Sequence, residues 1–211
     1  GPKAKVALQE LSDFNLDDVG RFRFVRDKVA QAKVLCSRTG YTGEDGFELY
    51  CLASDVTGLA NAILEVGESV GLQLVGLAAR DSLRLEAGYP LYGHEMDEEV
   101  TPLQAGLSWT VKWTKTNFMG REALLAEKEG GVKRKIIHFS LEGRRIAREG
   151  ETVWSQGNEV GRVVSGGFSP MLESPIGSAL ICSHSEAEEL FVDLRGTKVP
   201  LVVKKPPLHK S

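Results

Sequence analysis

The sequence predicts an α+β fold in two domains, an α+β domain over residues 1–130 and a small β-barrel or sandwich over residues 131–211. Before residue 130, strand-like runs alternate with longer helical patterns, which is typical of a two-layer α+β domain. After the Gly130-Gly131 pair, short strands follow one another with turn residues between them, and the helical patterns stop. A chain of 211 residues is long enough for two small domains.

The elements of the first domain are predicted from apolar periodicity and from the residues that start and stop helices. A short helix is expected at the N-terminus, one helix is expected to be capped by Ser54, and another is expected to end at Gly88. The expected helices cover residues 2–11, 55–70, 77–87 and 120–128. The expected strands cover residues 21–25, 32–36, 47–52 and 107–113. In the second domain, strands are expected over residues 135–141, 151–154, 159–164, 176–181, 189–194 and 199–203.

A glycine-rich loop separates the strands expected over residues 32–36 and 47–52. Its three glycines, spaced three apart, predict a tight turn with positive φ angles. No helix follows the loop and no Gly-Lys-Ser/Thr is present, which excludes a dinucleotide-binding loop and a phosphate-binding P-loop. The loop is expected to bring together four side chains, either as a polar hairpin tip or as a binding site: Tyr41, Glu44, Asp45 and Glu48.

The composition narrows the class of protein. Apolar residues make up 42% and charged residues 26% of the chain, as in ordinary soluble globular proteins. The net charge of −3 argues against a nucleic-acid-binding surface. No apolar run approaches the length of a membrane span, and no signal peptide opens the chain. The three cysteines form no C-x-x-C pair, which indicates a reducing compartment, and the four scattered histidines predict no metal site.

The helix expected over residues 77–87 carries two arginines. Arg80 and Arg84 are four residues apart and therefore share a face, and Asp81 stands beside them. One interpretation is that both arginines pair with acids of their own helix. Ser165 does not stand in a nucleophile elbow and is interpreted as part of a barrel turn.

Several motifs together resemble the glycine cleavage T-protein family of aminomethyltransferases, and they occur in the family's order over nearly the whole chain. In sequence they are Arg38-Thr-Gly-Tyr-Thr-Gly-Glu-Asp-Gly-Phe-Glu, Gly76-Leu-Ala-Ala-Arg-Asp-Ser-Leu-Arg-Leu-Glu-Ala-Gly, Leu91-Tyr-Gly-His, Thr101-Pro-Leu-Gln-Ala-Gly-Leu, Phe118-Met-Gly-Arg-Glu-Ala-Leu and Val164-Ser-Gly-Gly-Phe-Ser-Pro.

The resemblance implies part of a folate-binding α+β domain followed by a C-terminal β-barrel. It also implies transfer of an aminomethyl carbon from lipoylated H-protein to tetrahydrofolate, with release of ammonia. By motif position, Tyr41 and Glu48 match residues that hold the pterin ring, Arg80 matches the arginine of the folate site, and Tyr89 matches another folate-contacting tyrosine. A carboxylate suits the pterin N–H groups, and an arginine fork suits a carboxylate of the glutamyl tail.

The chain departs from the family pattern at both ends. The long N-terminal half that carries the family's catalytic aspartate is not in this chain, so no residue is assigned a catalytic role and the chain alone is expected to be inactive. A homodimer through exposed strand edges is a further expectation. The C-terminal Lys205-Pro-Pro-Leu differs from the family's usual Pro-Phe, so the barrel is not expected to close there in the usual way.

The expected compartment is the cytoplasm, or the mitochondrial matrix in a eukaryote. Two alternatives stay open: a folate-dependent demethylase or the folate domain of a sarcosine-dehydrogenase-type enzyme, and a non-enzymatic folate-binding paralogue that supports iron–sulfur proteins. The second type carries a cysteine motif where this chain has Lys115-Thr-Asn-Phe-Met-Gly-Arg-Glu, without cysteine.

Overall fold

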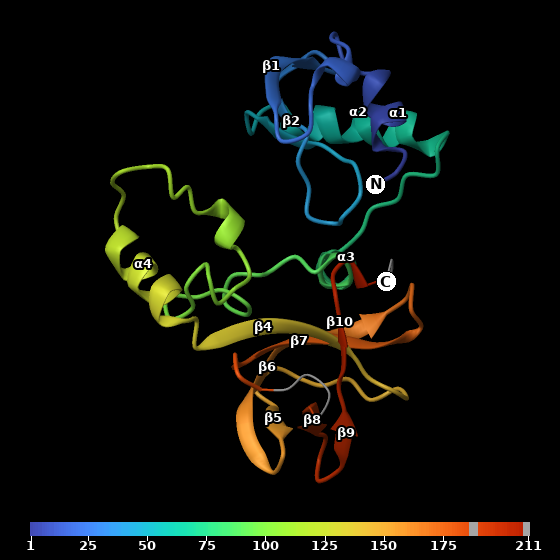
Figure 1. Ribbon diagram of the computed structural model, residues 1–211. Coiled ribbons are helices and arrows are strands. Elements are labelled where there is room, and N and C mark those ends of the chain that lie inside the picture. The colour runs from blue at the N-terminus through green and yellow to red at the C-terminus, as the bar shows by residue number, and fades with distance from the viewer. Residues whose placement is uncertain (186–189, 209–211) are drawn as a thin grey trace. The chain divides into compact units, whose positions relative to one another are not determined.

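The computed structural model describes residues 1–185 and 190–208, and over these residues it is an α+β structure with two separate antiparallel sheets (Figure 1). Contacts divide the chain into two compact units, Gly1–Arg80 and Asp81–Ser211, and the division falls within one helix. Whether the domain boundary lies near residue 130, as the change in sequence pattern indicates, stays a prediction.

The first unit is a three-stranded sheet covered on one face by helices. Hydrophobic side chains from the helices and strands form its core, with Leu8, Leu59 and Cys36 among the buried members. Figure 1 shows the helices α1 and α2 beside the strands of this unit. The strand order is β1-β2-β3, so β1 and β3 are the edges. The elements are α1 Ala4–Gln9, η1 Leu16–Asp18, β1 Phe24–Val29, β2 Ala32–Ser37, β3 Glu48–Cys51 and α2 Val56–Glu68.

Two predictions for this unit need correction. The strand expected over residues 21–25 begins only at Phe24, because Phe22 has a φ of 61° and the preceding residues form a turn. The residue at the N-cap position of α2 is Asp55, and the Ser54 hydroxyl donates to the Asp55 carboxylate at 2.9 Å. Ser54 therefore does not cap the helix.

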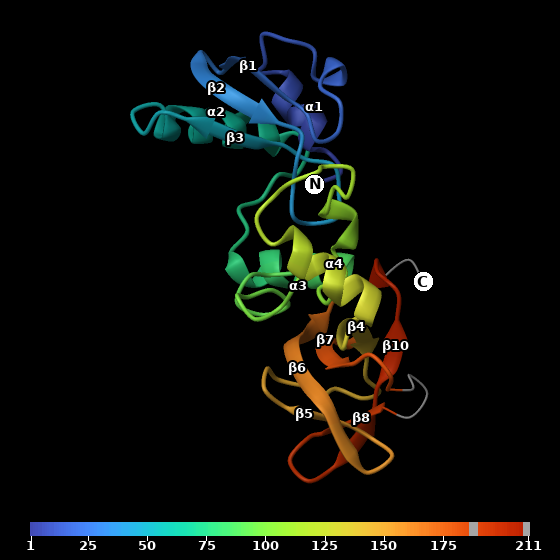
Figure 2. The ribbon, with the colours of Figure 1, turned by 60° about the vertical axis from the view of Figure 1, so that its left-hand side comes forward.

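The second unit contains a seven-stranded antiparallel sheet that curls into a nearly closed barrel, as expected for the C-terminal part (Figure 2). The strand order is β10-β4-β7-β6-β5-β8-β9. The two strands at the ends of this order, β9 and β10, are neighbours in sequence, so the chain itself joins the two edges. The elements are α3 Leu77–Ala87, η2 Ser108–Thr110, α4 Arg121–Gly130, β4 Arg134–Ser140, β5 Thr152–Ser155, β6 Asn158–Ser169, β7 Ser174–Cys182, β8 Leu190–Asp193, β9 Lys198–Pro200 and β10 Val202–Lys204.

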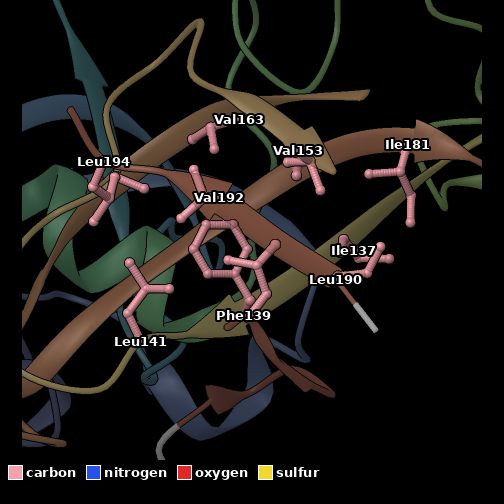
Figure 3. Close-up of a cluster of buried hydrophobic side chains, with 12 residues drawn as sticks. Ile137, Phe139, Leu141, Val153, Val163, Ile181, Leu190, Val192 and Leu194 are labelled. Atoms are coloured by element: carbon pink, nitrogen blue, oxygen red, sulfur yellow. The ribbon is translucent and has the colours of Figure 1, made fainter. Parts of the chain in front are cut away.

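Alternation of apolar side chains along the barrel strands produces the core of the barrel. In Figure 3, side chains from β4, β5, β6, β7 and β8 point toward one another around Phe139, which is fully buried. A smaller cluster in the same unit consists of Leu208, Leu85 of α3 and Ile176 of β7, all fully buried.

Two further predictions for this unit differ from the structure. The strand expected over residues 107–113 is wrong, since the structure has the 3-10 helix η2 there and Trp109 is exposed. The strand expected over residues 199–203 is two strands, one on each side of Leu201. Residue 189, where another expected strand begins, lies outside the described residues.

Candidate functional site

Arg38, the last residue before the glycine-rich loop, holds that loop in shape. The Arg38 guanidinium donates to both carboxylate oxygens of Asp45, at 3.0 and 2.8 Å, and so closes the loop on itself. It also donates to the backbone carbonyl of Val19 at 3.0 Å, which fastens the loop to the chain near η1. A hydrogen bond from Arg38, followed by its positive charge, lowers the pKa of the Asp45 carboxyl below its ordinary value.

Only one of the three loop glycines needs the conformation predicted for all of them. Gly43 has a φ of 80°, in the left-handed region that glycine adopts without penalty. The other two are not among the positive-φ residues. The loop therefore turns sharply once, at its middle, and the side chains on either side of Gly43 are placed by Arg38 and by the strands.

Tyr41 and Arg80 lie together in the first unit. The guanidinium carbon of Arg80 is 4.2 Å from the centroid of the Tyr41 ring, which is the geometry of a cation–π stack. Arg80 is exposed and, within residues 1–185 and 190–208, forms no ion pair. The stack covers one face of the tyrosine ring and leaves the arginine charge unneutralised by a carboxylate.

Glu48 stands at the other end of the loop, at the first position of β3. Its carboxylate is exposed and accepts a hydrogen bond from the Thr39 hydroxyl, which lies 3.1 Å from the Ser37 hydroxyl. Ser37 is paired with Glu48 in the sheet register, so the carboxylate is oriented by its neighbours on β2 and at the start of the loop. Glu44 is exposed, and Asp45 forms an ion pair with Arg38.

Tyr89 lies in the second unit, directly after α3. Gly88, with a φ of 74°, ends the helix as predicted: the Gly88 amide donates to the Leu85 carbonyl at 3.0 Å and the Tyr89 amide to the Arg84 carbonyl at 2.8 Å. These two bonds form the Schellman C-cap. Tyr89 is half-buried, and its backbone is fixed by the end of the helix.

A buried polar cluster in the second unit is the feature that sequence reasoning missed. Arg84 and Glu95 form an ion pair with the Arg84 Nη1 atom 3.0 and 2.9 Å from the two carboxylate oxygens, and their side chains are 2% and 1% exposed. Two barrel serines complete it. Arg84 Nη2 donates to the Ser165 hydroxyl at 2.9 Å, and the Ser178 hydroxyl donates to Glu95.

The cluster is electrostatically satisfied. Burial alone raises the pKa of Glu95, but the hydrogen bond from Ser178 and the charge of Arg84 outweigh it, so its pKa lies below the ordinary value. His138 is paired with Ser178 in the register of β4 and β7, and burial lowers its pKa below the ordinary value. Removing one partner of such a pair typically costs about 3–5 kcal/mol, because the other charge stays buried.

The sequence carried one signal for this cluster. The interpretation that both arginines of α3 pair with acids of their own helix holds for Arg84, whose Nε lies 2.7 Å from Asp81, but not for Arg80. Ser165, interpreted as part of a turn, lies inside β6 beside a register shift after Val163. Such a bulge redirects the side chains around it, and the Ser165 side chain reaches Arg84.

The described residues hold no group of three His, Cys, Asp or Glu side chains that could bind a metal ion. His209 lies outside that part of the chain. None of the described helices is both long and apolar enough to cross a membrane.

Comparison with known proteins gives matches over both parts of the chain. A model of the GCVT N-terminal domain matches residues 1–115, and a model of the glycine cleavage T-protein C-terminal barrel domain matches residues 134–210. The aminomethyltransferase of Caldanaerobacter subterraneus subsp. tengcongensis is 45% identical over 210 residues, which is 99% of this chain and 54% of that protein. The aminomethyltransferase of Thermoanaerobacter sp. strain X514 is 46% identical over 209 residues, 99% of this chain and 55% of that protein.

A solved structure agrees with these matches. The glycine cleavage system aminomethyltransferase T from Bartonella henselae superimposes with a TM-score of 0.89 at 34% identity, over 99% of this chain and 57% of that chain. This chain thus spans about half the length of the curated relatives it matches. On the two domain matches and on these identities, the chain belongs to the glycine cleavage T-protein family of aminomethyltransferases.

Proposed function

We propose that this chain carries part of the folate site of an enzyme that transfers the aminomethyl carbon of lipoylated H-protein to tetrahydrofolate and releases ammonia. The observation that carries the proposal is the Tyr41–Arg80 stack at 4.2 Å in the same unit as the exposed Glu48 carboxylate. Family membership supports the reaction class, because the matched relatives are named aminomethyltransferases.

The three side chains fit the chemistry of a reduced folate. Glu48 is an exposed carboxylate held by Thr39, and it can accept the neighbouring N–H groups along one edge of a pterin. Tyr41 offers a flat apolar ring, one face of which Arg80 covers. Arg80 has no ion-pair partner among the described residues, so its fork is available to a carboxylate of the glutamyl tail.

The chain's own residues in this proposal bind and orient; none of them is assigned a proton transfer. Tetrahydrofolate supplies the nitrogen atoms that accept the carbon. The expected catalytic aspartate matches no position of this chain, so turnover by the 211-residue chain alone is expected to be absent. Methylenetetrahydrofolate formation by this chain from aminomethylated H-protein would contradict that expectation.

Binding of tetrahydrofolate, measured by calorimetry on this chain, tests the site directly. Glu48→Gln keeps the shape of the side chain and removes its charge, so we expect binding to weaken by about 1–3 kcal/mol, the range for a charged hydrogen bond. Glu44→Gln is the matched control, since it removes an exposed carboxylate from the same loop. Equal affinities of the Glu48→Gln variant and the wild type would return the loop to a polar hairpin tip.

A further inference from the structure

The ion pair of Arg84 and Glu95 connects four segments of the second unit. Arg84 belongs to α3, and its Nη1 atom reaches Glu95 in the loop that follows the helix. From the barrel, Ser165 of β6 accepts from Arg84, and Ser178 of β7 donates to Glu95. The pair is therefore the point at which the helix, its following loop and two barrel strands are tied together.

The same arginine holds the backbone of Tyr89 on both sides. The Tyr89 amide donates to the Arg84 backbone carbonyl at 2.8 Å, and the Tyr89 carbonyl accepts from Arg84 Nη1 at 3.2 Å. Glu95 adds the next contact along the loop, because it accepts the Leu91 amide at 2.9 Å. The peptide groups around Tyr89 are thus held by the backbone of Arg84 and by the buried side chains of Arg84 and Glu95.

A buried ion pair is a poor source of stability. The cost of removing both charges from water offsets most of their attraction, and apolar pairs of similar volume often give equal or greater stability. An ion pair with these hydrogen bonds does fix the geometry of the groups it contacts, because each N–H of the arginine fork has a fixed direction. We therefore expect the pair of Arg84 and Glu95 to act by placing the groups to which it is hydrogen-bonded.

We propose that Arg84 and Glu95 are positioning residues for the folate site, which set the backbone of Tyr89 and, through α3, hold the turn that carries Arg80. The inference rests on the proposed function. Arg80 lies one helical turn before Arg84 on the same helix, so fixing the end of α3 limits rotation of the turn that presents Arg80. The two arginines then have separate roles, one to contact ligand and one to hold the framework.

The test replaces the pair by apolar residues and asks whether placement is lost while the fold is kept. The double variant Arg84→Met/Glu95→Leu removes both charges together, so no buried charge is left unpaired. Phe139→Leu is the control, because it disturbs the barrel core, a cluster of buried residues that includes none from α3 or the loop after it. Tryptophan fluorescence during urea unfolding measures the stability of each variant.

Two readouts follow on the same proteins. Hydrogen exchange of residues 89–96 reports whether Arg84 and Glu95 hold this segment of backbone. We expect these amides to exchange at least about tenfold faster in the double variant than in Phe139→Leu. Calorimetry with tetrahydrofolate reports the consequence, and we expect the Kd to rise about tenfold in the double variant, a size that small displacements of binding groups produce. Arg84→Lys keeps a charge without the fork and should share both effects in part.

The outcomes separate this inference from the proposed function. Unchanged exchange of residues 89–96 in the double variant overturns the positioning role, and so does faster exchange with unchanged folate affinity. A wild-type chain that does not bind tetrahydrofolate contradicts the proposal that the residues of this chain hold folate, and with it the claim that the pair serves that binding. A loss of affinity in Phe139→Leu as large as in the double variant shows a general effect of stability, and also overturns the inference.

Discussion

Gly88 joins α3 to Tyr89, and replacing it by alanine has two separable costs. The first is backbone strain, since the residue has a φ of 74°, where a Cβ atom costs about 1 kcal/mol. The second is space. A Cβ at this position would lie 2.3 Å from Pro206 Cβ and 2.5 Å from Pro206 Cγ, closer than real contacts allow. Overpacking of this kind costs about 1–3 kcal/mol, so Gly88→Ala should lose about 2–4 kcal/mol in total.

Gly150→Ala is the matched control, because Gly150 has a φ of 86° but no atom within 4 Å of an added Cβ. It should show the strain cost alone, and both variants share the effect of alanine on the unfolded chain. Urea unfolding followed by tryptophan fluorescence is suited to the comparison, since all three tryptophans lie in the unit that contains both glycines. Equal losses in the two variants would refute the argument that Pro206 presses on this position.

Three further outcomes are expected. The hydrogen bond from Arg38 is the largest cause that lowers the pKa of Asp45. The contact between Arg38 and Asp45 is therefore present above the ordinary aspartate pKa and is lost as the pH falls through the lowered pKa of Asp45. Carboxyl NMR on Arg38→Gln should show the pKa of Asp45 rising toward its ordinary value, and an unchanged pKa would contradict this. Burial raises the pKa of the Cys36 thiol to about 11, so iodoacetamide at neutral pH should modify the exposed Cys182 and leave Cys36 intact in the folded chain, as peptide mass spectrometry can check. Since β1 and β3 are edge strands, pairing between two copies is expected, and light scattering that finds a monomer at every concentration would exclude it.

Features that depend on neighbours in sequence were predicted well. The end of α3 at Gly88 follows from local backbone geometry, and the barrel follows from short strands separated by turns. The strand expected over residues 107–113 failed because alternation in sequence cannot supply a partner strand. In the structure this segment joins neither described sheet, and it forms a 3-10 turn with Trp109 exposed.

The buried cluster could not have been found in this way. Glu95 stands in a polar loop where an exposed side chain is the ordinary expectation. The two serines of the cluster come from strands far along the chain, Ser165 bonded to Arg84 and Ser178 to Glu95. Only the packing of α3 against the barrel shows that these groups meet. By contrast, Tyr41, Glu48 and Arg80 were selected by resemblance, and the structure adds the Tyr41–Arg80 contact without testing what the three residues bind.

The two arginines of α3 show why residue type and spacing do not determine a role. Both arginines lie on the same helix, and their spacing places them on the same face. In the structure Arg80 is exposed over an aromatic ring, whereas Arg84 is buried among Asp81, Glu95 and Ser165. Burial distinguishes them, because the Arg84 guanidinium already donates to side chains and a backbone carbonyl of its own unit, whereas Arg80 faces a neutral ring and keeps its charge available. One turn of the same helix therefore separates an exposed arginine, for which we propose folate contact, from a buried arginine, for which we propose a positioning role.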